Sequence, residues 1–152
     1  MVVRHHVDLE QKKVVVLGNG GAAQAIKAVV KKHHAKEMII VDIVDDGESI
    51  SYEECFEKHT DADVIINTSP IGMYPNVDAS PVDLTRFPNC KAVMDVVYNP
   101  LPTKLVAQAK ELGMIGVNGL EMLVAQAKYA VEIFLDTKID EDRIQEIYEK
   151  MK

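Results

Sequence analysis

The chain has 152 residues and a formal net charge of −7, from 24 acidic and 17 basic residues. This length fits one domain with a substantial core. The acidic balance and the 5% aromatic content, with no Trp, argue against a nucleic-acid partner. No apolar run reaches the roughly 20 residues of a membrane span, and no signal-peptide pattern opens the chain. We expect a cytoplasmic protein that binds neither nucleic acid nor a membrane, with a homo-oligomer possible.

The cysteines and the adjacent histidines do not form a pattern typical of a metal site. Cys55 and Cys90 lie far apart in the sequence, which favours free thiols in a reducing compartment over a disulfide or a metal site. His5 and His6 are neighbours, so on a strand they would point to opposite faces. We expect residues 1–12 to be a lead-in segment, extended or loosely held, ahead of a domain over residues 13–152.

A strand, a glycine turn and a helix are predicted at the start of this domain. Residues 13–17 are an apolar run typical of a parallel strand covered on both faces, and residues 21–34 have helical spacing. Between them Gly18, Gly20 and Ala23 fit the G-x-G-x-x-G/A pattern of a turn that lets a pyrophosphate approach the backbone at a helix N-terminus. The pattern predicts dinucleotide binding. A turn without a ligand, or with another nucleotide-like ligand, has the same pattern.

The helix after the turn is expected to bury one side and to expose its lysines. We expect the inner side to hold Ala22, Ala25, Ile26, Val29 and Val30. We expect water to surround Lys27, Lys31 and Lys32.

The second predicted strand, over residues 38–42, ends in an acidic residue. Asp42 follows Gly18 by 24 positions, near the place where an acid binds the ribose hydroxyls of NAD. Methyltransferase-like nucleotide folds have an acid there too. Ser51 and Glu54 then form a capping box for a short helix that ends near His59.

A polar loop follows the third predicted strand, over residues 63–67. Residues 67–75 contain one glycine and two prolines, and loops at the carboxyl ends of parallel strands line the ligand crevice. Residues 76–89 are expected to be irregular or briefly helical.

The remaining predicted elements are a strand over residues 91–98, a helix from Pro102 to Leu112, a strand over residues 114–117, a turn at Asn118-Gly119, a helix over residues 120–135 and a last helix from Asp140.

Strands that alternate with helices predict a parallel sheet between two layers of helices. The fold class is therefore α/β, a Rossmann-like doubly wound parallel sheet in three layers, α/β/α. The expected strand order is 3-2-1-4-5.

Four motifs in this order resemble the cofactor-binding, C-terminal domain of shikimate dehydrogenases: GNGGAAQAI, INTSPIGM, DVVYNPLPTKLVAQAKELG and NGLEMLVAQAKYAVEIF. The resemblance covers the chain from Lys13 to about Leu135. Members of that family reduce 3-dehydroshikimate to shikimate with NADPH, in the pathway to aromatic amino acids. The resemblance thus implies an oxidoreductase domain that binds NAD or NADP.

The resemblance also implies roles for particular residues. Those expected at the pyrophosphate are Gly18, Asn19, Gly20, Gly21, Ala22 and Ala23. Those expected to flank the adenosine and nicotinamide portions are Thr68, Ser69 and Met73. Those expected to border the nicotinamide are Val97, Gly119 and Met122. Tyr98 and Gln126 are expected to face the substrate, shikimate or 3-dehydroshikimate.

The chain departs from the family pattern at its beginning. Family members have a substrate domain ahead of this one, and that domain carries the serines that bind the substrate carboxylate and a lysine–aspartate pair. Only residues 1–12 precede the first predicted strand here. We therefore expect no catalytic residue in this chain and no activity unless a substrate domain is supplied.

The second departure concerns the cofactor. NADP-specific members follow the second strand with Asn-Arg-Thr, whereas this chain has Asp42-Ile43-Val44. The arginine that binds the 2′-phosphate is missing, and a carboxylate would repel that phosphate. NAD is favoured, against the family's habit of using NADP, although Lys31, Lys32 or Lys36 could soften the repulsion.

Three functions remain open from the sequence. The first is the cofactor domain of a shikimate dehydrogenase, with shikimate or quinate as the substrate. The second is a non-catalytic dinucleotide-binding or regulatory module. The third is a methyltransferase-type fold, against which the INTSPIGM loop and the GLEMLVAQA helix argue.

Overall fold

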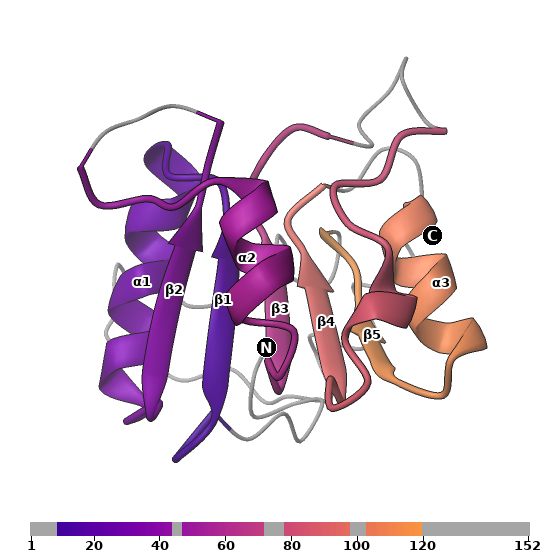
Figure 1. The fold of residues 1–152 in the computed structure, drawn as a ribbon, viewed down its shortest axis with the longest axis horizontal. Helices are drawn as coiled ribbons and strands as arrows, with labels where there is room; N and C mark the ends of the chain where they lie inside the picture. The colour runs from indigo at the N-terminus through magenta and orange to yellow at the C-terminus, as the bar shows by residue number, and fades with distance from the viewer. Residues whose placement is uncertain (1–8, 44–46, 72–77, 98–102, 120–152) are drawn as a thin grey trace, which may run out of the picture.

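The computed structural model describes residues 9–43, 47–71, 78–97 and 103–119, which form one parallel sheet with helices on its faces (Figure 1). The helices and strands in these residues are β1 (Lys13–Leu17), α1 (Gly21–Lys32), β2 (Glu37–Val41), α2 (Tyr52–Lys58), β3 (Val64–Asn67), the 3-10 helix η1 (Leu84–Arg86), β4 (Ala92–Asp95), α3 (Lys104–Glu111) and β5 (Ile115–Val117).

The sheet order is β2-β1-β3-β4-β5, so the predicted order 3-2-1-4-5 is wrong. β1 pairs with β2 on one side and with β3 on the other. Alternating strands and helices predict right-handed parallel crossovers, but they do not decide to which side of β1 the third strand goes. α1 and α2 lie on opposite faces of the sheet, and the right-handed crossover through α2 therefore places β3 on the far side of β1.

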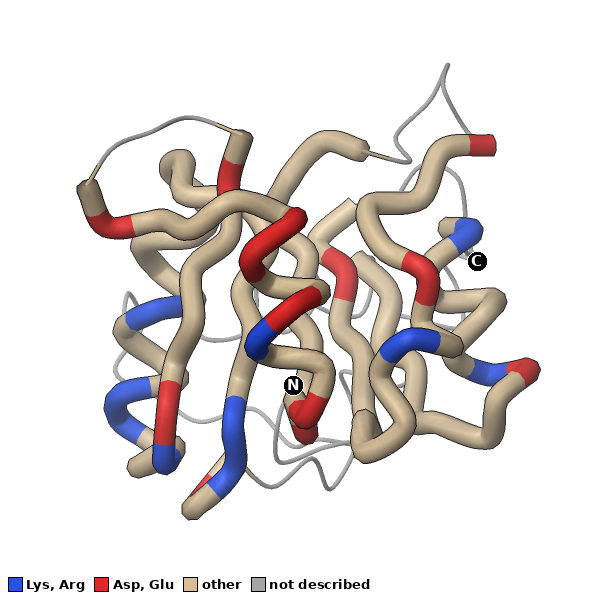
Figure 2. The backbone as a smooth tube through the Cα atoms, viewed as in Figure 1, with Lys and Arg blue, Asp and Glu red and all other residues tan. Residues whose placement is uncertain are grey.

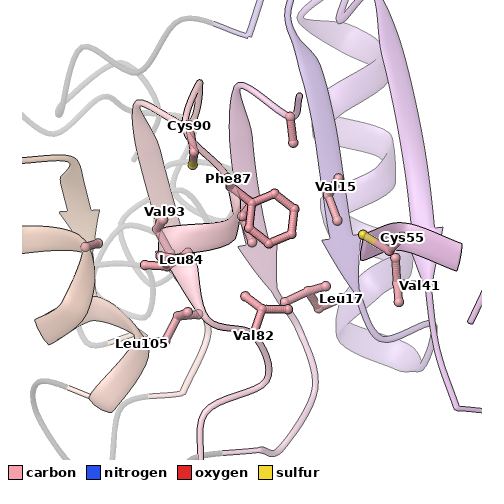
Figure 3. Close-up of a cluster of buried hydrophobic side chains, with 13 residues drawn as sticks. Val15, Leu17, Val41, Cys55, Val82, Leu84, Phe87, Cys90, Val93 and Leu105 are labelled. Carbon is pink, nitrogen blue, oxygen red and sulfur yellow. The ribbon is translucent and has the colours of Figure 1, made fainter. Parts of the chain in front are cut away.

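Both faces of the sheet are buried, which confirms the predicted three layers. Val14 and Val16 belong to the core cluster that includes residues of α1. Val15 and Leu17 belong to the opposite cluster, with residues from α2, η1 and α3. In that second cluster Phe87 is fully buried at the centre (Figure 3). Because successive strand residues point to opposite faces, the apolar run of β1 has no polar interruption.

The buried side of α1 differs from the prediction. Ala23, Ile26, Lys27 and Val30 are buried, whereas Ala22, Ala25 and Val29 are exposed. The observed spacing of i, i+3, i+4 and i+7 is an ordinary helical stripe. Alanines and valines occur on most sides of this helix, so hydrophobicity alone does not indicate which side is buried. The prediction that water surrounds Lys27 was wrong.

The first residue of the third helix also differs from the prediction. The expected helix from Pro102 begins instead at Lys104, with Thr103 as its N-cap. A threonine hydroxyl can accept a bond from a backbone N–H of the first turn, so the chain begins the helix after Thr103. The predicted capping box at α2 is confirmed on its N-cap side, since Ser51 Oγ accepts from Glu54 N–H at 3.1 Å.

Strands are shorter than the apolar runs suggest, and β4 ends at Asp95 rather than at residue 98. Leu9, ahead of β1, is 1% exposed and joins the core cluster on the α1 face, so the end of the lead-in segment is packed. The predicted helices over residues 120–135 and after Asp140 lie outside the described residues. None of the described helices is long and apolar enough to span a membrane.

Candidate functional site

Two loops meet where β1 and β3 end. Thr68 binds the last residue of β1 twice, because both its N–H and its hydroxyl donate to the Leu17 carbonyl at 2.8 Å. Gly18 has a φ of +98°, and a Cβ there would lie 2.8 Å from Thr68 Oγ1 and 3.1 Å from Ser69 N. Only glycine fits this backbone and this contact. Gly18, Thr68 and Ser69 are therefore brought together at the point where the connections from β1 and β3 diverge, which is where ligands bind in such sheets.

The glycine turn leaves open space where a phosphate would approach. A Cβ at Gly20 or at Gly21 would have no atom within 4 Å. Gly20 is the N-cap of α1, without a capping side-chain bond and without an acidic residue in the first turn. The helix N-terminus thus presents backbone N–H groups and a positive partial charge that suit a pyrophosphate. Ala23 is fully buried against the sheet, where its small side chain lets helix and strand pack closely.

Asp42 is fixed next to the glycine turn. Its Oδ2 accepts the backbone N–H of Asn19 at 2.8 Å, and its Oδ1 accepts the N–H of Ile43 at 2.6 Å. A carboxylate has further acceptor positions at both oxygens, so these bonds leave acceptors for a pair of hydroxyls. Burial, with Asp42 and Cys55 nearby, raises the pKa of Tyr52 to about 12, so the phenol at the start of α2 stays neutral beside this carboxylate.

A lysine and a glutamate that sequence reasoning missed lie against the same turn. Lys27 Nζ donates to Asn19 Oδ1 at 2.8 Å and forms an ion pair with Glu48 Oε1 at 2.9 Å. Asn19 Nδ2 donates to Glu48 Oε2 at 3.3 Å. The available signal was that Lys27 lies four positions after Ala23, on the buried stripe of α1.

The lysines in or next to α1, β1 and β2 bear on whether a cation lies close to Asp42. Figure 2 shows lysines along α1 and near the lower ends of β1 and β2, where Glu37 also lies, and it shows acidic residues at the upper end of β2 and in the loop that follows. Lys31 and Lys32 are in the last turn of α1, about 15 Å along the axis from its first residue. Lys36 precedes β2 at the amino edge of the sheet. None of these three lysines is near Asp42.

A buried polar network joins the loop after β3 to the end of β4 and the start of α3. Asp95 Oδ1 accepts from Asn67 Nδ2 at 3.1 Å and from Val97 N–H at 3.0 Å, and Asp95 Oδ2 accepts from the Thr103 hydroxyl at 2.8 Å. Asn67 Oδ1 in turn accepts from Ser69 Oγ at 2.6 Å. Burial raises the pKa of Asp95, and its hydrogen bonds partly oppose that rise. Sequence reasoning missed the network, although an aspartate within an apolar strand was a signal for it.

β4 and β5 end in a second close backbone contact. Gly119 N–H donates to the Val97 carbonyl at 3.2 Å, and a Cβ at Gly119 would lie 2.5 Å from the carbonyl carbon of Val97. Both residues are buried. The structure thus brings together Val97 and Gly119, which the resemblance places beside the nicotinamide. Four other candidate residues lie outside the described residues: Met73, Tyr98, Met122 and Gln126.

Several known proteins to which this chain is similar are named shikimate dehydrogenases. The shikimate dehydrogenase (NADP(+)) of Clostridium perfringens strain SM101 is 37% identical over 164 residues, which cover 100% of this chain and 59% of that protein. The chorismate mutase/shikimate 5-dehydrogenase fusion protein of Clostridium acetobutylicum is 37% identical, with a TM-score of 0.90 over 99% of this chain and 58% of that one.

A third similar protein was solved with a dinucleotide. The shikimate 5-dehydrogenase of Listeria monocytogenes in complex with shikimate and NAD is 25% identical, with a TM-score of 0.77 over 96% of this chain and 58% of that one. No family model matches the chain. The chain thus spans about three fifths of the length of these relatives (59% and 58%).

Proposed function

Because the chain corresponds over its whole length to the dinucleotide-binding part of the shikimate dehydrogenase family, we propose that it binds NAD(P) along the carboxyl edge of its sheet. The observation that carries the proposal is the glycine turn at the β1–β3 junction. There the backbone at Gly20 is open, Gly18 is packed against Thr68, and the N-terminus of a twelve-residue helix is uncapped by any side chain. These features suit a pyrophosphate.

The order of the strands suggests how the dinucleotide lies. Asp42 follows β2 and would accept hydrogen bonds from the adenosine ribose. Thr68 and Ser69 follow β3 and would lie beside the middle of the molecule. Val97 and Gly119 follow β4 and β5 and would border the nicotinamide, with Met73 and Met122 completing the cofactor site. In this arrangement the cofactor crosses the sheet from β2 towards β5.

The proposed cofactor is NAD rather than NADP. Asp42 has its carboxylate fixed by Asn19 and Ile43, and Ile43 is 85% exposed with no charged donor to offer. Lys31, Lys32 and Lys36 lie too far along the fold to compensate, since salt screens exposed charges beyond about 10 Å. The name of the Clostridium perfringens relative contains NADP, and the Listeria monocytogenes complex contains NAD, so the relatives include both cofactors.

The proposed reaction is the reduction of 3-dehydroshikimate to shikimate by the whole protein. The nicotinamide supplies the hydride when bound, and this chain positions it. Tyr98 and Gln126 would contact the substrate from the cofactor side. The general acid that protonates the new hydroxyl, and the groups that bind the substrate carboxylate, are proposed to come from a substrate domain. Quinate remains a second possible substrate.

A non-catalytic dinucleotide-binding module is the alternative that the fold alone allows. The methyltransferase-type alternative has less support, because the similarity to shikimate dehydrogenases extends over the whole chain. A module without chemistry would bind the dinucleotide but would not support turnover with any substrate domain.

Replacement of Gly20 by valine tests the cofactor site. The new side chain would meet no protein atom near its Cβ, and the backbone at Gly20 is extended, so the Gly20→Val variant should fold. It would project into the space left for the pyrophosphate. We expect calorimetry to show a loss of NAD+ affinity of about 100-fold or more, roughly 2.7 kcal/mol.

The control for this experiment is Ala28→Val, which places a valine on the exposed side of the same helix. It should leave the dissociation constant for NAD+ unchanged. Unchanged affinity in a folded Gly20→Val variant would contradict the proposed site.

A further inference from the structure

Two carboxylates, rather than one, converge on Asn19 in the glycine turn. Asp42 accepts the backbone N–H of Asn19, and Glu48 accepts from its side-chain amide. Asp42 follows β2, whereas Glu48 lies in the connection that leads to α2. Both acids therefore contact the residue that lies between the β2 end of the crevice and the open backbone of Gly20.

Lys27 brings a positive charge to Asn19 and Glu48. Its side chain is only 10% exposed, while that of Glu48 is 53% exposed. Helix side chains point back towards the helix N-terminus, which lets a lysine in the second turn of α1 reach the glycine turn. The ammonium of Lys27 then contacts Glu48 Oε1 at 2.9 Å and Asn19 Oδ1 at 2.8 Å. Within the part of the chain that the structure describes, the contacts of Asn19 thus bring two carboxylates and one ammonium to the glycine turn.

We propose that Glu48 is a second specificity residue for the cofactor, which holds Lys27 in an ion pair and adds its own charge to that of Asp42. The arrangement would accept a ribose with free hydroxyls and reject a 2′-phosphate. The inference rests on the proposed dinucleotide function and adds two residues to its specificity. Loss of the Glu48 charge would both remove one repulsion and release Lys27 to contact the phosphate.

The experiment measures dissociation constants for NAD+ and NADP+ by calorimetry in the wild-type chain and three variants. Glu48→Gln keeps the shape of the side chain and removes its charge. Glu48→Gln with Lys27→Met also removes the cation. Glu54→Gln is the matched control, because it removes one negative charge from an exposed ion pair with Lys58 within α2.

Glu48→Gln should tighten NADP+ binding by about tenfold or more, because a doubly charged phosphate loses one nearby repulsion and gains a cation. NAD+ binding should change by less than about threefold. The adenosine ribose of NAD+ is uncharged, and a partly exposed charge such as that of Glu48 has a small effect on it. Addition of Lys27→Met should reverse most of the gain for NADP+, and high salt should reduce it. Glu54→Gln should change neither constant.

The outcomes separate this inference from the function on which it rests. An unchanged ratio of the two constants in a folded Glu48→Gln variant that binds NAD+ would overturn the inference alone. The same gain in Glu54→Gln would also overturn it, since the effect would then be one of overall charge. Failure of the wild-type chain to bind either dinucleotide would overturn both proposals.

Circular dichroism and thermal unfolding of each variant check that it is folded. Glu48→Ala provides a second uncharged residue at the site.

Discussion

Asp42 occupies a restrained position, and this restraint gives its charge an effect on ligand choice. Its two carboxylate oxygens each accept a backbone N–H, from Asn19 and from Ile43. A side chain fixed in this way cannot rotate away from a phosphate without breaking a charge-assisted hydrogen bond. Repulsion at this position is therefore more selective than repulsion from a mobile surface acid.

Asp42→Asn tests this position. We expect the ratio of the NADP+ and NAD+ dissociation constants to fall by about tenfold or more, because the variant loses a negative charge beside the ribose. NAD+ itself should bind more weakly. The carboxylate of Asp42 has two oxygens that can accept hydrogen bonds from the ribose hydroxyls, whereas the amide of asparagine has only one. Calorimetry with both cofactors measures the two constants.

Asp61→Asn is the control for Asp42→Asn. Asp61 accepts from Lys13 Nζ at 2.6 Å at the opposite edge of the sheet, so its loss changes net charge without changing the crevice. Tighter binding of NADP+ than of NAD+ by the wild-type chain would contradict the proposed preference.

Single residues differ in how well the sequence predicts them. Gly18 and Asp42 could be placed because the motif fixes their spacing along the chain, and in the structure they lie at the carboxyl ends of β1 and β2, with Asp42 bonded to the turn at Asn19. Lys27 could not, since its ion-pair partner Glu48 lies 21 positions later, beyond β2, and is brought to it only by the fold. Asp95 was overlooked for the same reason: its donors come from three separate segments.

At the level of elements, Thr103 connects α3 to the proposed nicotinamide end of the crevice. Its Oγ1 accepts the N–H of Val106 at 3.3 Å as the helix N-cap and donates to Asp95. Asp95 then holds Val97 and Asn67, and Asn67 holds Ser69. Through this chain of hydrogen bonds, the start of one helix fixes two loops at the carboxyl edge.

Thr103→Val should lower the free energy of unfolding by about 2–4 kcal/mol, because it removes an N-cap and leaves a buried carboxylate short of a donor. Thr103 is 1% exposed, so the matching shape of valine limits any packing effect. Urea unfolding measures the loss. Thr103→Ser keeps the hydroxyl and should recover most of the stability.

The loss in Thr103→Val should be greater at neutral pH than in acid. Burial raises the pKa of Asp95 in the folded state, so its favourable contribution is present below the unfolded pKa and is lost as pH rises through the folded pKa. The Thr103 hydroxyl lowers that folded pKa, and its removal therefore matters most where Asp95 is charged. An equal loss in acid and at neutral pH would contradict this role.

The elements also show what periodicity can decide. All five strands of the described residues, and the helices α1, α2 and α3, were predicted, since alternation of strand and helix patterns is strong in this chain. The order of the strands was not, because the face covered by α2 depends on where Cys55 and its neighbours find partners in three dimensions. The N-cap at Thr103 was missed because a proline just before it offered an equally plausible helix start.

At the level of the whole molecule, the described residues form one edge with a different chemistry at each end. Acids lie at the β2 end, open glycine backbone lies at the β1–β3 junction, and buried, close-packed backbone lies at the β4–β5 end. Such an edge positions a dinucleotide, but a hydride transfer also needs a proton donor for the developing alkoxide. Neither a motif nor the geometry of the described residues assigns that donor to this chain.

The isolated chain of 152 residues is therefore expected to bind the dinucleotide without turning over shikimate. The reason is that catalysis requires cofactor, substrate and acid to be held together, and one half of that arrangement gives little acceleration. The measurement follows the absorbance of NADH or NADPH with shikimate and with quinate, in the same preparation whose NAD+ binding has been determined by calorimetry. A complete shikimate dehydrogenase serves as the positive control for the assay. Cofactor-dependent oxidation of shikimate by this chain, abolished by Gly20→Val, would show that the acid lies within it and would direct the search to Tyr98 and Gln126.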